Sequence, residues 1–335
     1  MVWIKFTACL VVIIIAGTKL SKYGDLIARK TGLGRVWIGV VLLATITSLP
    51  ELATGISSVS LIGKPDLTLG DLFGSNLTNL AIIALIDVFY TRGPVLHFLG
   101  TGIVLATILS TMLIAVVATF LYIAHNVNSL GIANYLGLYS IIFLCLYLLA
   151  QYMLFRFQHN QQGQATDNEP VTEYNEDISL KKISIFFSVA ALATIVAGTW
   201  LGFIGNEISE ITGLKASFVG TLFLAICTSA PEIVVAISAA RMGALDMAVG
   251  NVVGSNLFNM GVIIFIDDLF YTAGPILSHV AMDHISTALF AILMSCAVII
   301  GLIYRPRSWP RLWVGVDTTT LAVLYFGAIV VLYFL

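Results

Sequence analysis

The chain has 335 residues, of which 59% are hydrophobic and only 10% are charged, and its mean hydropathy is +1.00. Soluble domains carry about 25% charged residues, so this composition excludes an ordinary soluble domain and predicts an all-α membrane protein with several spans. The formal net charge is −2, and the sequence has no basic patch that would suit nucleic acid. The four cysteines lie singly in apolar segments, without metal-ligand spacing.

About 20 apolar residues are enough for a helix to cross the hydrocarbon core of a bilayer. Runs of this length predict ten transmembrane helices, near residues 2–20, 36–62, 67–90, 95–123, 131–155, 183–205, 214–240, 247–271, 281–304 and 312–335. No small-residue cleavage pattern follows the first run, so we interpret it as a transmembrane helix rather than a signal peptide.

The basic residues alternate between the loops. With ten spans, all but three of the 16 lysines and arginines fall at odd-numbered loops; the exceptions are Lys5, Lys64 and Lys215. Because cytoplasmic loops are enriched in Lys and Arg, we expect both termini outside and the 156–182 loop in the cytoplasm. The short loops are typical of a protein of a prokaryotic plasma (inner) membrane.

The 156–182 loop divides the chain into 1–155 and 183–335. It is rich in Gln, Asn and acidic residues, a composition that predicts a solvated linker rather than a folded domain. Calcium sensing by its five carboxylates is the alternative interpretation.

The two halves repeat each other. Thr-Ser-Leu-Pro-Glu at 47–51 returns as Thr-Ser-Ala-Pro-Glu at 228–232, and Gly-Ser-Asn-Leu-Thr-Asn at 74–79 returns as Gly-Ser-Asn-Leu-Phe-Asn at 254–259. Five spans per copy is an odd number, so the second copy must be inverted in the membrane, as in many secondary transporters. Elements at equal depth then meet near the midplane, and we expect Glu51 and Glu232 to be neighbours.

A carboxylate in hydrocarbon is costly, so each buried glutamate is a candidate functional residue. Helical spacing places a threonine and a serine beside each of them, namely Thr47 and Ser48 beside Glu51, and Thr228 and Ser229 beside Glu232. Each proline also leaves the carbonyl four residues earlier unpaired, at Ile46 and Cys227.

The Gly-Ser-Asn segments supply partner helices. Ser75 and Asn79 are four residues apart, as are Ser255 and Asn259, and the nearby glycines permit close helix approach. An all-oxygen set with two carboxylates suits Ca²⁺, which accepts six to eight oxygen ligands. Once the Ca²⁺ leaves, two buried anions need replacement cations, and an obligatory exchange of this kind is antiport.

We expect structural roles for the other polar residues in the spans. We interpret Asp71 as an interfacial residue at the start of the third span, because the second copy has Asn251 at the corresponding position. Asp87, Asp267 and Asp268 lie at span ends, where we expect them to reach water. We assign Asn76 and Asn256 to helix packing.

At the two repeated blocks the chain resembles the calcium/cation antiporter superfamily, most closely its prokaryotic sodium/calcium exchangers. The resemblance implies the sodium/calcium exchanger fold. It also implies ion ligation by Thr47, Ser48, Glu51, Ser75 and Asn79 in one repeat, by Thr228, Ser229, Glu232, Ser255 and Asn259 in the other, and by the backbone carbonyls of Ala44 and Ala225. The chain departs from that family at Asn259, where an aspartate is usual, and this leaves proton exchange open.

We therefore expect a secondary active transporter, not an enzyme, that exchanges Ca²⁺ for Na⁺ within a lipid bilayer and needs no cofactor. Calcium/proton exchange at the same site is the nearest alternative. An intramembrane hydrolase using the glutamates as acid and base lacks a nucleophile or zinc pattern. A calcium-binding channel or sensor is a third alternative. The sequence leaves the oligomeric state open.

Overall fold

The structure is a computed structural model and describes residues 1–31, 38–90, 93–126, 131–132, 136–162, 179–304 and 316–335. The elements of the first half are α1 (Val2–Thr31), η1 (Ile38–Leu43), α3 (Ala44–Thr47), α4 (Leu49–Ile56), η2 (Ser57–Ile62), α5 (Pro65–Phe89), η3 (Val95–Phe98), α6 (Thr101–Asn126), β1 (Gly131–Ile132), β2 (Leu136–Gly137) and α7 (Leu138–Gln162). Those of the second half are α8 (Leu180–Thr212), α9 (Ala216–Val219), η4 (Gly220–Leu224), α10 (Ala225–Thr228), α11 (Ala230–Arg241), α12 (Leu245–Phe258), η5 (Asn259–Ile263), α13 (Ile264–Phe270), η6 (Ile276–Ser278), α14 (His284–Tyr304) and α15 (Val316–Phe334). The two short strands pair antiparallel.

The expected ten spans are confirmed. Among the described residues, 8 helices are long and apolar enough to cross a membrane, and two bent pairs bring the total to 10. The pairs bend by 45° between Thr47 and Leu49, and by 44° between Thr228 and Ala230. A proline follows each bend closely and cannot donate a backbone hydrogen bond, so the helix breaks there.

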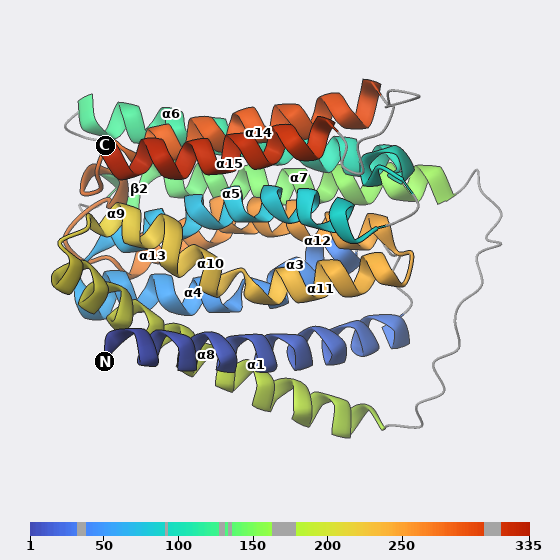
Figure 1. Ribbon diagram of the computed structural model, residues 1–335, viewed down its shortest axis with the longest axis horizontal. Helices are drawn as coiled ribbons and strands as arrows, with labels where there is room; N and C mark the ends of the chain where they lie inside the picture. The colour runs from blue at the N-terminus through green and yellow to red at the C-terminus, as the bar shows by residue number, and fades with distance from the viewer. Residues whose placement is uncertain (32–37, 91–92, 127–130, 133–135, 163–178, 305–315) are drawn as a thin grey trace.

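The two five-helix repeats run in opposite directions. Both chain termini lie at one end of the bundle, whereas α7 ends and α8 begins at the other end (Figure 1). Helices α1 and α8 lie antiparallel along one side, and α6, α14 and α15 lie along the opposite side (Figure 1). The bent helices, α5 and α12 lie between these layers and form the centre of the bundle.

The first and sixth spans are longer than their apolar runs. Helix α1 continues to Thr31 and α8 covers 33 residues, from Leu180 to Thr212. At 1.5 Å per residue a helix of that length reaches about 50 Å, more than the hydrocarbon thickness of about 30 Å. Their polar ends therefore extend beyond the bilayer core. Gly213, at φ +71°, ends α8 in the left-handed conformation that glycine adopts without strain.

Close backbone contacts join the repeats at the centre. A Cβ atom on Gly74 would overlap the carbonyl oxygen of Thr221, and one on Gly254 would overlap that of Val40. Helix α5 thus packs directly on η4, and α12 packs directly on η1. Small residues allow membrane helices to approach in this way. Each Gly-Ser-Asn segment is thereby held against the bent helix of the other repeat.

Candidate ion-binding site

Glu51 lies in the first turn of α4, directly after the bend, and is fully buried. Its Oε1 atom accepts a hydrogen bond from Ser75 Oγ of α5 at 3.4 Å and one from Ser229 Oγ of the other repeat at 3.4 Å. The partial positive charge of the helix N-terminus also favours a carboxylate here.

Glu232 has the matching position in α11 and is equally buried. Its Oε1 atom accepts from Ser255 Oγ of α12 at 3.2 Å and from Ser48 Oγ of the first repeat at 3.5 Å. Each glutamate is therefore bonded by a serine from each repeat. The two motifs meet at the centre of the bundle, as inversion predicts.

Each glutamate keeps one free oxygen. The Oε2 atoms of Glu51 and Glu232 have no hydrogen-bond partner among the described residues. Two buried carboxylates with unused acceptor positions are costly unless a cation or proton neutralises them. Within the same described part, no three His, Cys, Asp or Glu side chains converge on one point. Hydroxyl, amide and carbonyl oxygens would have to complete the shell of a bound ion.

The two threonines and alanine carbonyls lie at the bends. Thr47 Oγ1 is 3.4 Å from Ala44 O, and Thr228 Oγ1 is 3.4 Å from Ala225 O. Each of these carbonyls also accepts the backbone N–H of the next serine at 3.0 Å. Each threonine hydroxyl also lies closer to another carbonyl, Leu43 O at 3.0 Å and Leu224 O at 3.1 Å, and when it donates there the alanine carbonyl keeps one lone pair.

The two asparagines predicted as ligands differ in their surroundings. Asn79 Nδ2 donates to Asn256 Oδ1 at 2.9 Å, and Asn256 Nδ2 donates to Asn76 O at 3.4 Å. Asn259 opens the π-helical turn η5, and its side chain has no hydrogen-bond partner in the described structure. Helix α5 has no such turn at Asn79, so the repeats are not symmetric at this position.

The interfacial position expected for Asp71 is wrong. Helix α5 begins at Pro65, and Asp71 lies nearly two turns inside it, fully buried. Its Oδ1 atom accepts from Thr228 Oγ1 at 2.9 Å. The sequence contained a signal for this, because Asp71 precedes Ser75 by four residues and so shares its helix face.

Asn251 makes the equivalent contact in the other repeat. Thr47 Oγ1 donates to Asn251 Oδ1 at 3.2 Å, and Asn251 also precedes a site serine, Ser255, by four residues. Asp71 and Asn251 thus contact predicted site residues, a placement that the sequence analysis missed.

The expectation that Asp267 and Asp268 reach water is also wrong, since both are fully buried. The chain folds back over Asp268, which accepts from the backbone N–H groups of Ile276 at 2.7 Å and Gly137 at 2.8 Å. Ser140 Oγ donates to it as well, at 2.5 Å. Backbone donors from the following loop and from β2 of the first repeat thus hold this carboxylate away from water.

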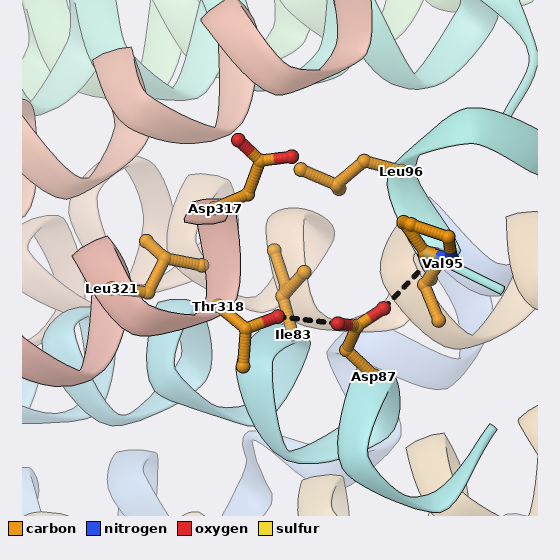
Figure 2. A pocket seen from close by; sticks show the side chains of 8 residues that line it. Ile83, Asp87, Val95, Leu96, Asp317, Thr318 and Leu321 are labelled. Carbon is orange, nitrogen blue, oxygen red and sulfur yellow. Dashed lines mark hydrogen bonds between the residues drawn. The ribbon is translucent and has the colours of Figure 1, made fainter. Parts of the chain in front are cut away.

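Asp87 is partly buried and bonded in the same way. Figure 2 shows the Thr318 hydroxyl and the Val95 amide directed at its carboxylate, beside a cavity of about 10 Å³, while Asp317 points elsewhere. A cavity of that size has room for about one water molecule.

A membrane bundle of two inverted five-helix repeats, with a symmetric pair of buried carboxylates where they meet, defines a secondary transporter of cations. The family described as "Sodium/calcium exchanger protein" matches residues 1–155 and 182–334. The chain belongs to this family. It is accordingly a cation/Ca²⁺ antiporter, and its family consists of transporters rather than enzymes.

Relatives and a solved structure agree with this assignment. Over 94% of its length the chain is 29% identical to the sodium/calcium exchanger MaX1 of Methanosarcina acetivorans, covering 93% of that protein. Over 76% it is 26% identical to the inner membrane protein YrbG of Escherichia coli, covering 75% of it. The structure of the exchanger NCX_Mj matches with a TM-score of 0.63 at 18% identity, over 99% of this chain and 100% of that one, and so supports the fold.

Proposed function

We propose that this antiporter exchanges Ca²⁺ for Na⁺ and that Glu51 and Glu232 bind both ions in turn. The observation that carries the proposal is the matched environment of the two carboxylates. Each is fully buried, each is held at Oε1 by one serine from each repeat, and each has a free Oε2. The name of the relative MaX1, a sodium/calcium exchanger, supports the choice of ions.

In the Ca²⁺-bound state the two glutamates neutralise the charge of the ion. We propose that the remaining ligands are oxygens of Thr47, Ser48, Ser75, Asn79, Ala44, Thr228, Ser229, Ser255, Asn259 and Ala225. Ca²⁺ tolerates six to eight such ligands in flexible geometry, so a few of them suffice at any one time. When Ca²⁺ leaves, monovalent cations must replace it, because two bare buried carboxylates would repel each other.

Proton exchange at the same glutamates is the second candidate. The observation in its favour is Asn259, an uncharged side chain at the position where the resemblance leads one to expect an aspartate. A buried glutamate can be neutralised by a proton as well as by Na⁺. The two functions share the site and the fold and differ only in the counter-ion.

We further propose that α1 and α8 slide as a unit across the site to give alternating access. Both helices contact the bends through a glycine. A Cβ on Gly17 of α1 would lie 2.5 Å from Pro231 Cγ, and one on Gly198 of α8 would lie 2.8 Å from Pro50 O. Each outer helix thus passes over the proline of the motif in the opposite repeat, with no side chain between them.

The organisation along the chain follows the same proposal. Residues 1–155 and 183–335 are the two repeats and 156–182 is the linker, of which 163–178 lies outside the described residues. We place both termini outside and the linker in the cytoplasm, on the distribution of Lys and Arg. The name of the relative YrbG, an inner membrane protein, supports an inner membrane location.

Counter-ion dependence of Ca²⁺ flux in proteoliposomes tests the proposal. An outward Na⁺ gradient should drive Ca²⁺ uptake, and collapsing that gradient should stop it. A pH gradient alone should drive little uptake. Uptake that follows the pH gradient and ignores Na⁺ would instead assign the second candidate.

The same vesicles distinguish an exchanger from a channel. With Ca²⁺ inside and no Na⁺ on either side of the membrane, efflux should be negligible, since the emptied site cannot return without a counter-ion. Rapid efflux under these conditions, with no accompanying change in internal pH, would overturn both forms of exchange.

A further inference from the structure

Repeat symmetry separates structural carboxylates from additional ones. Asp87 and Asp268 correspond in the two repeats and share two kinds of partner, a backbone N–H from the following loop and a hydroxyl. Val95 N donates to Asp87 Oδ1 at 2.7 Å, and Ile276 N donates to Asp268 Oδ1 at 2.7 Å. A hydroxyl completes each set, from Thr318 in one case and Ser140 in the other. These two acids hold the loop that follows their span.

Two other buried acids have no such counterpart. Asp71 corresponds to Asn251, and Asp267 corresponds to Ile86. Asn251 accepts from Thr47 much as Asp71 accepts from Thr228, so that hydrogen bond does not need a charge. Each copy of the fold therefore forms without one of these carboxylates, the second without Asp71 and the first without Asp267, although a buried charge is expensive to keep.

Both acids have unused oxygens. Asp71 and Asp267 are 0% exposed, and within the described part of the chain Asp71 Oδ2 and both Asp267 oxygens lack a hydrogen-bond partner. Buried polar groups are nearly always satisfied in folded proteins. Three unsatisfied carboxylate oxygens on residues that the fold does not require indicate a ligand.

Contacts connect the two acids to the glutamate site. Both Asp267 oxygens lie against Gly55, one turn after Glu51 on α4, at 2.5 and 2.8 Å from the position of a Cβ. Thr68 Oγ1 donates to Gly55 O at 3.3 Å. On α5, Thr68 and Asp71 are three residues apart and share a helix face.

These contacts extend from the glutamate site toward one end of the bundle. From Glu51 the α4 helix runs toward the end of the bundle that carries both termini (Figure 1). Asp71 interacts electrostatically with Glu51 and Glu232, and Asp267 interacts with Asp71. The acids thus extend the negative charge of the site toward one membrane face only, because Asn251 and Ile86 stand at the corresponding positions of the other repeat.

We propose that Asp71 and Asp267 bind a sodium ion beside the glutamate pair, on the side of the chain termini. The position is additional to the site between Glu51 and Glu232, and the symmetry-related position has Asn251 and Ile86 in place of the two acids. One Na⁺ and one proton on the carboxyl pair would together neutralise the two added charges, and Thr68 and Ser75 supply neutral oxygens on the shared face of α5. The inference rests on the proposed sodium exchange.

Sodium binding to the intact, unmodified protein gives the first test. Equilibrium dialysis with radioactive sodium, in detergent and without Ca²⁺, should count three Na⁺ per chain: one for each glutamate and one at Asp71 and Asp267. A count of two overturns the inference. If the protein exchanges Ca²⁺ for Na⁺ in vesicles but binds only two Na⁺, the proposed function stands and this inference alone fails.

Variants provide the second test. Asp71→Asn copies the residue of the other repeat, and Asp267→Asn removes the charge with little change in volume. Each should lower the count to two and raise the half-saturating Na⁺ concentration for exchange about tenfold or more. The matched control, Asp87→Asn, should still bind three Na⁺. If either Asp71→Asn or Asp267→Asn leaves both the number of bound Na⁺ and the sodium dependence of exchange unchanged, the proposed sodium site is wrong.

Discussion

Replacing either Glu51 or Glu232 with glutamine should abolish calcium exchange. The amide keeps the size of the side chain but removes a charge that Ca²⁺ requires, and removing one partner of a buried charge pair costs about 2–5 kcal/mol. That energy corresponds to a loss of Ca²⁺ affinity between roughly thirtyfold and several thousandfold. Ca²⁺ flux in proteoliposomes and calorimetric Ca²⁺ binding in detergent would both measure it.

The symmetry of the repeats adds a second requirement to this prediction. Since Glu51 and Glu232 have equivalent burial and equivalent serine partners, the two variants should fail to similar extents. Glu207→Gln is the matched control, because that carboxylate pairs with Lys5 at a partly exposed position and such pairs contribute little. It should exchange normally. Near-normal flux in both Glu51→Gln and Glu232→Gln would exclude the glutamate pair as the ion site.

The second large effect is expected at the contacts between the outer helices and the bends. Gly17→Ala and Gly198→Ala should each slow exchange about tenfold or more while Ca²⁺ binding persists. An added methyl group would overlap Pro231 in one case and the Pro50 carbonyl in the other. Overpacking of this kind costs about 1–3 kcal/mol. A barrier raised by about 1.4 kcal/mol slows the sliding step tenfold.

Gly327→Ala is the control for these variants, because a Cβ there would meet nothing within 4 Å. It should exchange at the normal rate, and comparison of Ca²⁺ binding with flux would separate slow sliding from loss of the site. Normal flux in Gly17→Ala and Gly198→Ala would show that α1 and α8 do not pass over the prolines during transport.

Much of the fold could be predicted because a bilayer restricts it strongly. A spanning segment must be apolar and helical, so hydropathy located the ten spans and an odd number per copy required inversion. The predicted ends of the spans were less accurate. The polar residues after position 20 continue α1 to Thr31, since a helix that leaves the membrane no longer needs apolar side chains.

The centre of the site was also predictable, because it depends on spacing within helices and on symmetry between repeats. The motifs placed Glu51, Glu232 and four serines together, and the hydrogen bonds agree with that placement. We propose ligand roles for these residues. Asn259 is buried as well, and both polar atoms of its side chain lack a hydrogen-bond partner within the described structure.

The main error of the sequence-based prediction was the placement of the acidic residues near the ends of the spans. The sequence placed Asp71, Asp267 and Asp268 by their distance from the ends of apolar runs, which says nothing about what covers them. Asp268 is buried because the chain after α13 folds back and donates the Ile276 N–H to it, while β2 of the first repeat donates the Gly137 N–H. Asp71 is buried because the second repeat packs closely on this part of α5, where Thr228 Oγ1 donates to it. Both causes are tertiary and leave little trace in local hydropathy.

Diffraction from crystals grown with Ca²⁺, collected where calcium scatters anomalously, tests the central claim most directly. An anomalous peak should lie between Glu51 and Glu232, about 2.3–2.6 Å from a carboxylate oxygen of each. The peak should disappear in Glu51→Gln crystals grown under the same conditions. A calcium peak bound elsewhere, with none between the two glutamates, would contradict the account.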